Sequence, residues 1–116
     1  MRSDASAAVL NDMLHHLALA EHFLGDLSLK QFAEDVRTVY AVTRCLEIIS
    51  EASRRLPDEV RERHPHIAWR QMAAAGNVYR HQYEDVAARY VWNTVKQSLP
   101  SLRAVVETEL RASAGT

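Results

Sequence analysis

Apolar positions along the chain recur at steps of three and four residues, which is the period of an amphipathic α-helix. The first stripe consists of Leu10, Met13, Leu14, Leu17 and Leu24, and a glycine follows it directly at position 25. A glycine just after the last apolar position is typical of a helix end. Sustained two-residue alternation is absent from the sequence, so the pattern predicts an all-α fold.

A second apolar pattern covers positions 36–53 and occupies two neighbouring faces of one predicted helix. Leu46 and Ile49 belong to the first face, and Cys45 and Ala52 belong to the second. Asp26 or Ser28 can cap the short turn through Phe32 that precedes this helix. A helix that is apolar on two faces needs two packing partners.

Prolines divide the remainder of the chain. Pro57 is followed by two acidic residues, which predicts a short helix over 57–63, because proline fits a first helical turn and acids complement the N-terminal dipole. Pro65 ends that helix, and Pro100 marks a break between two later helices. The remaining apolar segments predict helices over 69–79, 86–99 and 100–111. Four main helices with short connections predict an antiparallel bundle.

Length and composition suit a single domain, since the chain has 116 residues, of which 47% are hydrophobic. We expect a domain over 1–111 and a flexible tail over 112–116. The single cysteine, Cys45, cannot form an internal disulfide, and no apolar stretch approaches the roughly 18 residues that a membrane span needs. The N-terminus also lacks a secretory signal pattern. These features predict a soluble, cytoplasmic protein.

Charge is balanced over the whole chain but unevenly distributed along it. The 14 lysines and arginines against 15 acidic residues give a net charge of −1, which excludes a protein that is basic overall. Residues 1–50 hold four basic and seven acidic side chains, a local net of −3. Residues 53–81 hold six arginines and three acids, a local net of +3. This asymmetry favours an interaction surface in the middle of the chain.

The segment GNVYRHQY at 76–83 is the most informative part of the sequence. In a helix, Asn77 and His81 would lie one turn apart on the same face. The segment occurs together with RCLEIISEA at 44–52 and WNTV at 92–95. With these motifs, the chain resembles the HepT-like branch of the HEPN superfamily from about Leu10 to Leu110.

The resemblance implies a small helical bundle that pairs as a homodimer and acts as a metal-independent endoribonuclease toxin, with no cofactor. It also implies a partner, a minimal nucleotidyltransferase antitoxin that transfers AMP to a tyrosine of the toxin. The family motif is an arginine, four to six residues, a histidine, and a tyrosine two positions later. His81 matches the histidine, Tyr83 matches the modified tyrosine, and Asn77 matches the asparagine that usually follows the arginine.

The family's arginine is absent, and Gly76 stands at the best-aligned position. One helical turn later the chain carries Arg80, and helical side chains lean toward the N-terminus of their helix. Our hypothesis is that Arg80 swings back over the space that Gly76 leaves empty and supplies the guanidinium.

RNA cleavage without a metal needs a base for the 2′-hydroxyl proton, an acid for the leaving oxygen and a cation for the phosphorane charge. Histidine can serve as acid or base near neutral pH, so His81 is the candidate proton carrier. Arg80 is the candidate cation, because a guanidinium stays charged and matches phosphate geometry. Asn77 either makes a hydrogen bond at the site or across the dimer, or is a plain residue at a helix end.

The missing arginine leaves a second function open: a catalytically lapsed module that binds RNA, a nucleotide or the nucleotidyltransferase without cleavage. A plain structural homodimer is a third alternative. Arg54, Arg55 and Arg70 form either a solvated rim or the phosphate-contacting edge of an RNA groove, whose sign would be steep salt dependence of binding.

Other conspicuous residues have simpler interpretations. Glu47 and Glu51 share a helical face, but salt bridges to Arg44 or Arg54 are favoured over an acid pair. His64 and His66 flank a proline without a third ligand at recognisable spacing, so no metal site is expected. The two tryptophans, at 69 and 92, are expected to pack in the core.

Overall fold

A computed structural model of the protein describes residues 4–77 and 84–114. These residues form helices throughout, which confirms the all-α prediction. The helices are α1 (Asp4–Leu24), α2 (Leu29–Glu34), α3 (Val36–Arg54), α4 (Asp58–Arg63), α5 (Trp69–Ala74), α6 (Glu84–Asn93) and α7 (Leu99–Ala114). α7 therefore extends three residues into the segment 112–116 that the sequence predicts as a tail.

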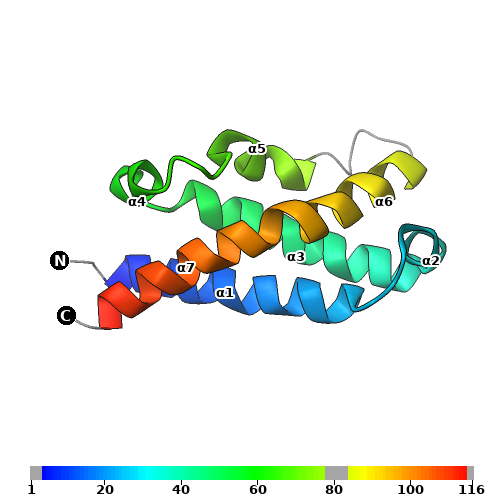
Figure 1. The fold of residues 1–116 in the computed structure, drawn as a ribbon, viewed down its shortest axis with the longest axis horizontal. Coiled ribbons are helices and arrows are strands. Elements are labelled where there is room, and N and C mark those ends of the chain that lie inside the picture. Colours follow the sequence, from blue (N-terminus) through cyan, green and yellow to red (C-terminus); the bar gives the residue numbers. More distant parts are fainter. Residues whose placement is uncertain (1–3, 78–83, 115–116) are drawn as a thin grey trace.

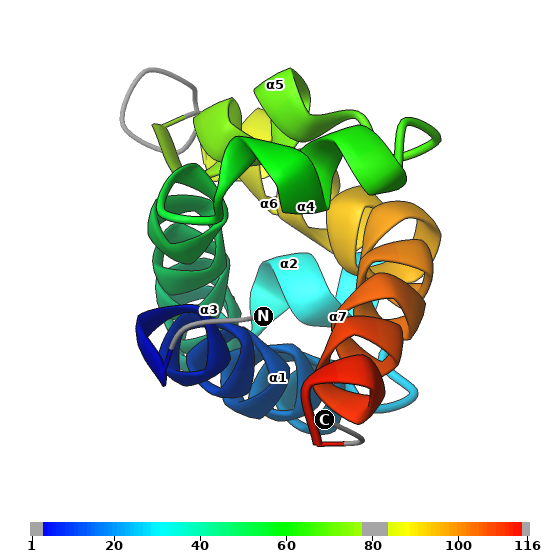
Figure 2. The same ribbon diagram turned by 90° about the vertical axis from the view of Figure 1, so that its left-hand side faces the viewer.

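The long helices run lengthwise in a molecule of 46 × 25 × 21 Å (Figure 1). α1 packs against both α3 and α7, while α3 also contacts α5 and α6. Seen end-on, α1, α3 and α7 lie around the long axis and α4 with α5 covers the remaining side (Figure 2). The two-faced apolar pattern of α3 thus has the two sets of partners that it needs.

Most of the predicted core positions on α1 are buried, and Leu14 is half-buried and packs against the core. On α1 the residues Leu10, Met13, Leu17 and Leu24 are almost fully enclosed, and Gly25 ends the helix with φ +52°, a conformation that glycine adopts without strain. On α3 Cys45, Leu46, Ile49 and Ala52 are buried. Val36 and Tyr40, near the start of the predicted apolar pattern, are instead 60% and 57% exposed. Burial raises the pKa of the Cys45 thiol, as expected for a small residue held in the core.

Side-chain caps fix the starts of α2 and α3. Ser28 accepts a hydrogen bond from the backbone N–H of Gln31 (3.1 Å), and the Gln31 side chain accepts one from the Ser28 N–H (2.9 Å), so Ser28 is the cap of α2. Asp35 caps α3 by accepting bonds from the Thr38 hydroxyl (2.8 Å) and backbone N–H (3.1 Å). These two bonds lower the pKa of Asp35.

The predicted break at Pro100 is wrong. α6 passes through a π-helical turn, Thr94–Ser98, directly into α7, and Pro100 lies in the first turn of α7. Proline lacks the N–H that would bond to the carbonyl four residues earlier. A wider π turn just before it carries the chain past this missing donor without ending the helical run.

A buried carboxylate joins the end of α4 to α7. Glu109 accepts hydrogen bonds from Arg63 Nη2 (2.7 Å) and from His64 Nε2 (2.7 Å), and its side chain is only 5% exposed. Its hydrogen bond raises the pKa of Arg63. His64 is therefore engaged in holding two helices together.

Both tryptophans pack against the core, as predicted, and each indole N–H has a partner. Trp69 Nε1 donates to the carbonyls of Arg61 (3.1 Å) and His64 (3.0 Å), and Trp92 Nε1 donates to the carbonyl of Leu27 (3.1 Å). Across the part of the chain that the structure describes, no helix has the length and apolarity to cross a membrane.

Candidate functional site

The motif predicted to carry the chemistry begins at the end of α5. Asn77 is exposed and closes a 3-10 turn over 75–77. Arg80, His81 and Tyr83 lie outside the described residues. A helix is predicted over 69–79, but the α-helix ends at Ala74. Asn77 therefore lies outside it, and the α-helical spacing assumed from Asn77 to His81 does not hold at Asn77.

Gly76 lies directly against α3. Its backbone N–H donates a hydrogen bond of 3.0 Å to Ser50 Oγ, and Ser50 is buried. A Cβ at position 76 would stand 2.9 Å from the Cα of Glu47, which is closer than real Cβ atoms approach backbone. The space beside Gly76 is therefore filled by α3, which corrects the expectation that it is empty. This contact explains why position 76 holds a glycine.

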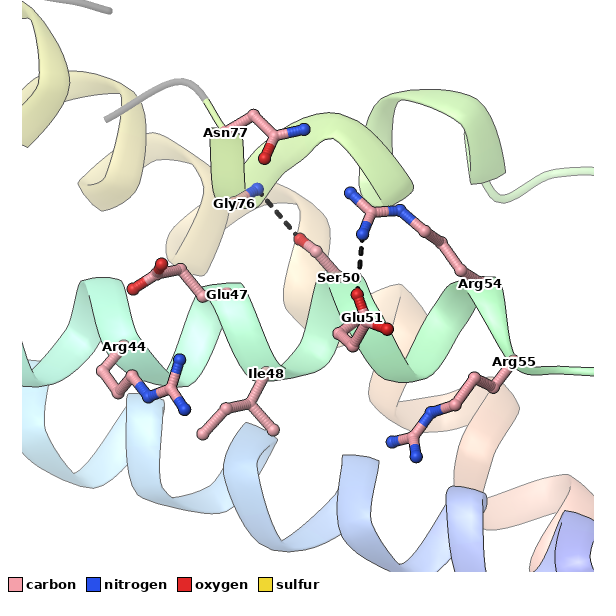
Figure 3. Close-up of a pocket in the computed structure, with 9 residues that line it drawn as sticks. All are labelled: Arg44, Glu47, Ile48, Ser50, Glu51, Arg54, Arg55, Gly76 and Asn77. Carbon is pink, nitrogen blue, oxygen red and sulfur yellow. Dashed lines mark hydrogen bonds and ion pairs between the residues drawn. The ribbon is translucent and has the colours of Figure 1, made fainter. Parts of the chain in front are cut away.

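An open groove lies beside this contact, on the outer face of α3 (Figure 3). It has a volume of about 470 Å³ and is bounded by α3 and by the 3-10 turn. Its α3 residues follow one another at helical spacing, so they form a single stripe along the helix. The lining residues are Arg44, Glu47, Ile48, Ser50, Glu51, Arg54, Arg55, Gly76 and Asn77.

Two of the three arginines predicted as an RNA-contacting rim, Arg54 and Arg55, line this groove, whereas Arg70 is exposed on α5 outside it. Arg54 is held on both sides: it donates to Glu51 Oε2 (2.8 Å) and to the carbonyl of Ala73 (2.5 Å). The predicted pairing of Glu51 with Arg54 is thus confirmed, and Arg54 also ties α3 to α5.

The other groove arginines are more loosely held. Arg55 lies 3.6 Å from Asp12, and both side chains are about half exposed, so water screens this pair. Arg44 is exposed and has no ion-pair partner within residues 4–77 and 84–114. Figure 3 shows Arg44 and Arg55 on the α1 side of α3 and Asn77 on the opposite side. The groove therefore offers two accessible guanidinium groups.

Two further arginines of the basic middle segment are paired with acids. Arg61 pairs with Asp58, and Arg63 pairs with the buried Glu109. Within the described ranges, no group of three or more histidine, cysteine or acidic side chains could hold a metal ion. The groove can bind an anion, because its described lining residues include three arginines and two glutamates.

The sequence singled out neither Arg44 nor Ser50 as a functional residue. Arg44 could have been found from the polar stripe that it forms with Glu47, Glu51 and Arg55 at helical spacing. Ser50 could not, because its importance comes from a contact with a residue 26 positions away in the chain.

The chain is similar over most of its length to known proteins. A family described as "Ribonuclease HepT-like" matches residues 13–109. A protein of Thermococcus cleftensis named "Probable ribonuclease HepT" is 39% identical over 98 residues, which are 84% of this chain and 89% of that protein. Two Methanocaldococcus jannaschii proteins provisionally named as RNases are 34% and 33% identical over 100 residues, 86% of this chain and 86% and 83% of theirs. No solved structure matches significantly.

Proposed function

Because the chain belongs to the HepT-like family of ribonucleases, we propose that it is the toxin of a toxin-antitoxin pair and cleaves RNA as a homodimer without a metal ion. The observation that carries this proposal is the match of nearly the whole chain to proteins named as ribonucleases. The groove supports it, because arginine side chains lie next to the turn from which the motif continues.

The proposed reaction is attack of the RNA 2′-oxygen on the neighbouring phosphorus. The new 2′-O–P bond forms as the bond to the 5′-oxygen of the next nucleotide breaks, which leaves a 2′,3′-cyclic phosphate and a 5′-hydroxyl. His81 takes the 2′-hydroxyl proton, and a second acid, the His81 of the other protomer, protonates the leaving oxygen. Arg80 stabilises the charge that develops on the phosphorane, and Asn77 hydrogen-bonds the substrate.

Silencing is proposed to occur by transfer of AMP to Tyr83 from a minimal nucleotidyltransferase. The added phosphate carries negative charge and bulk two residues from His81. An RNA phosphate that approached His81 would be repelled, because like charges at close range disfavour binding. Modification and RNA binding would then exclude each other.

A second candidate is a module that binds RNA, a nucleotide or the nucleotidyltransferase without cleaving anything. The observation that favours it is the lack of room for any side chain at position 76, where the family motif has its arginine. An experiment can distinguish the two candidate functions by measuring whether the protein cleaves RNA.

The test in cells is induced expression of the chain with and without the nucleotidyltransferase. We expect growth arrest that His81→Ala relieves and that the nucleotidyltransferase also relieves, with AMP-sized mass additions on Tyr83 in the intact protein. Tyr83→Phe should stay toxic in the presence of the nucleotidyltransferase. Arrest that persists in His81→Ala would contradict the nuclease proposal, and absence of arrest together with a stable nucleotidyltransferase complex would select the binding module.

A further inference from the structure

The groove on α3 contains arginines of two different kinds. Arg54 is fixed between Glu51 Oε2 and the carbonyl of Ala73, so two of its N–H donors are engaged and the second of them ties α3 to α5. Arg44 has no ion-pair partner in the described parts of the chain, and Arg55 has only the loose contact with Asp12. The guanidinium groups available to a ligand are therefore those of Arg44 and Arg55.

The charge of the groove favours an anionic ligand. Glu51 is compensated by Arg54 at 2.8 Å, and Glu47 is half-buried. Among the described lining residues three arginines face two glutamates, a net charge of +1, and the pairing of Arg55 with Asp12 of α1 is weakened by water because both side chains are about half exposed. A planar guanidinium can bind two oxygens of one phosphate, which makes phosphate groups the best-matched anions.

The shape and composition of the groove favour a nucleic-acid strand over a protein partner. Among the described lining residues Ile48 is the single large apolar side chain, whereas a protein interface is centred on buried aromatic and aliphatic anchors. Arg44 and Arg55 are eleven residues apart in the sequence, which corresponds to about 16 Å along the helix axis. Two phosphate contacts at that separation suit an extended strand and not a single small anion.

We propose that this groove binds the backbone of a single RNA strand, with Arg44 and Arg55 contacting phosphates and Arg54 serving as part of the groove wall. The inference rests on the proposed function for the identity of the nucleic acid. Asn77 borders the groove and precedes His81 by four residues in the sequence.

The test measures binding of the full-length wild-type protein to a short fluorescein-labelled 2′-O-methyl RNA by fluorescence anisotropy at several salt concentrations. This probe lacks the 2′-hydroxyl nucleophile, so binding is measured without cleavage. Arg44→Ala and Arg55→Ala should each raise Kd roughly fivefold to tenfold at low salt. Each should also reduce the magnitude of the slope of log K against log salt by about 0.7, the value for one phosphate contact on a single strand.

Arg111→Ala is the matched control, because Arg111 is exposed on α7 away from the groove, and it should leave Kd and slope unchanged. Unchanged affinity and slope in both groove variants would overturn the proposal. Light scattering measures the oligomeric state of each variant. If a groove variant becomes monomeric but binds RNA as before, the groove is a protein contact and the proposal is also overturned.

Failure of the proposed function gives a different result. If the wild-type protein binds the probe through Arg44 but leaves unmodified RNA intact, the groove proposal stands and the nuclease proposal is wrong. If the wild-type protein cleaves RNA and both Arg44→Ala and Arg55→Ala bind the probe normally, the nuclease proposal stands and the groove proposal is wrong.

Discussion

At position 76 two backbones meet with no room for a side chain. The Gly76 N–H reaches Ser50 Oγ at 3.0 Å, and a Cβ would come within 2.9 Å of the Glu47 Cα. The neighbouring atom belongs to the backbone of a long helix, so it cannot move aside as a flexible side chain would. A single residue type thus fixes how closely the start of the motif approaches α3.

Gly76→Ala is expected to lower the free energy of unfolding by about 1–3 kcal/mol, because the added methyl group overpacks a closed contact. Gly76→Arg should destabilise at least as much, and RNA cleavage should not rise although the substitution restores the residue of the family motif. Urea unfolding followed by circular dichroism, together with a cleavage assay, measures both effects.

The control is Gln71→Arg, which adds the same charge at an exposed position of α5 and should leave stability nearly unchanged. A Gly76→Arg protein with wild-type stability and faster cleavage would show that the contact with α3 does not decide which residue occupies this position.

At the scale of the helices, periodicity predicted most of the fold. The start of α3 after Asp35 and the end of α1 at Gly25 follow from capping and glycine rules that act within a few residues. The continuous run through Pro100 does not follow from such rules, because proline normally ends a helix and a π turn compensates for it here.

α5 also ends earlier than the local sequence rules predict. The N–H of Gly76 is donated to the Ser50 side chain of α3, which favours a tight 3-10 turn over continuation of the α-helix. A contact between residues so far apart in the chain leaves no local pattern in the sequence. The candidate site was predicted through the family motif, whereas the groove that borders it depends on this contact between helices.

The contact of Arg63 and His64 with Glu109 provides a test of how α4 is held to α7. Glu109→Ala removes an almost fully buried carboxylate that accepts from two side chains. We expect the free energy of unfolding to fall by about 1–3 kcal/mol, less than the roughly 3–5 kcal/mol for a fully buried pair, because Arg63 is 46% exposed and regains water. Chemical unfolding at neutral pH measures this loss.

The matched control is Glu21→Ala, which removes a glutamate paired with Arg103 between α1 and α7 at 36–37% exposure. Its effect should stay below about 1 kcal/mol, the usual value for pairs that water reaches. Equal losses in the two variants would show that burial of Glu109 adds nothing to the connection between α4 and α7.

For the whole molecule, folding redistributes the charge that the sequence presents. The middle segment carries a local excess of arginine, but Asp12 of α1 and Glu109 of α7 approach two of these arginines from distant parts of the chain. Arg44, which lies in the half of the sequence with an acidic excess, remains accessible beside the groove. The net charge of each sequence segment therefore indicated a basic surface but did not identify which arginines line the groove.

We propose that the chain is a metal-independent ribonuclease that depends on His81. The most direct measurement is incubation of purified protein with end-labelled single-stranded RNA in excess EDTA, with products resolved on a denaturing gel. We expect fragments that end in a 2′,3′-cyclic phosphate for the wild type and for Arg111→Ala, and intact RNA for His81→Ala. Intact RNA with the wild type, or equal cleavage by His81→Ala, would contradict it.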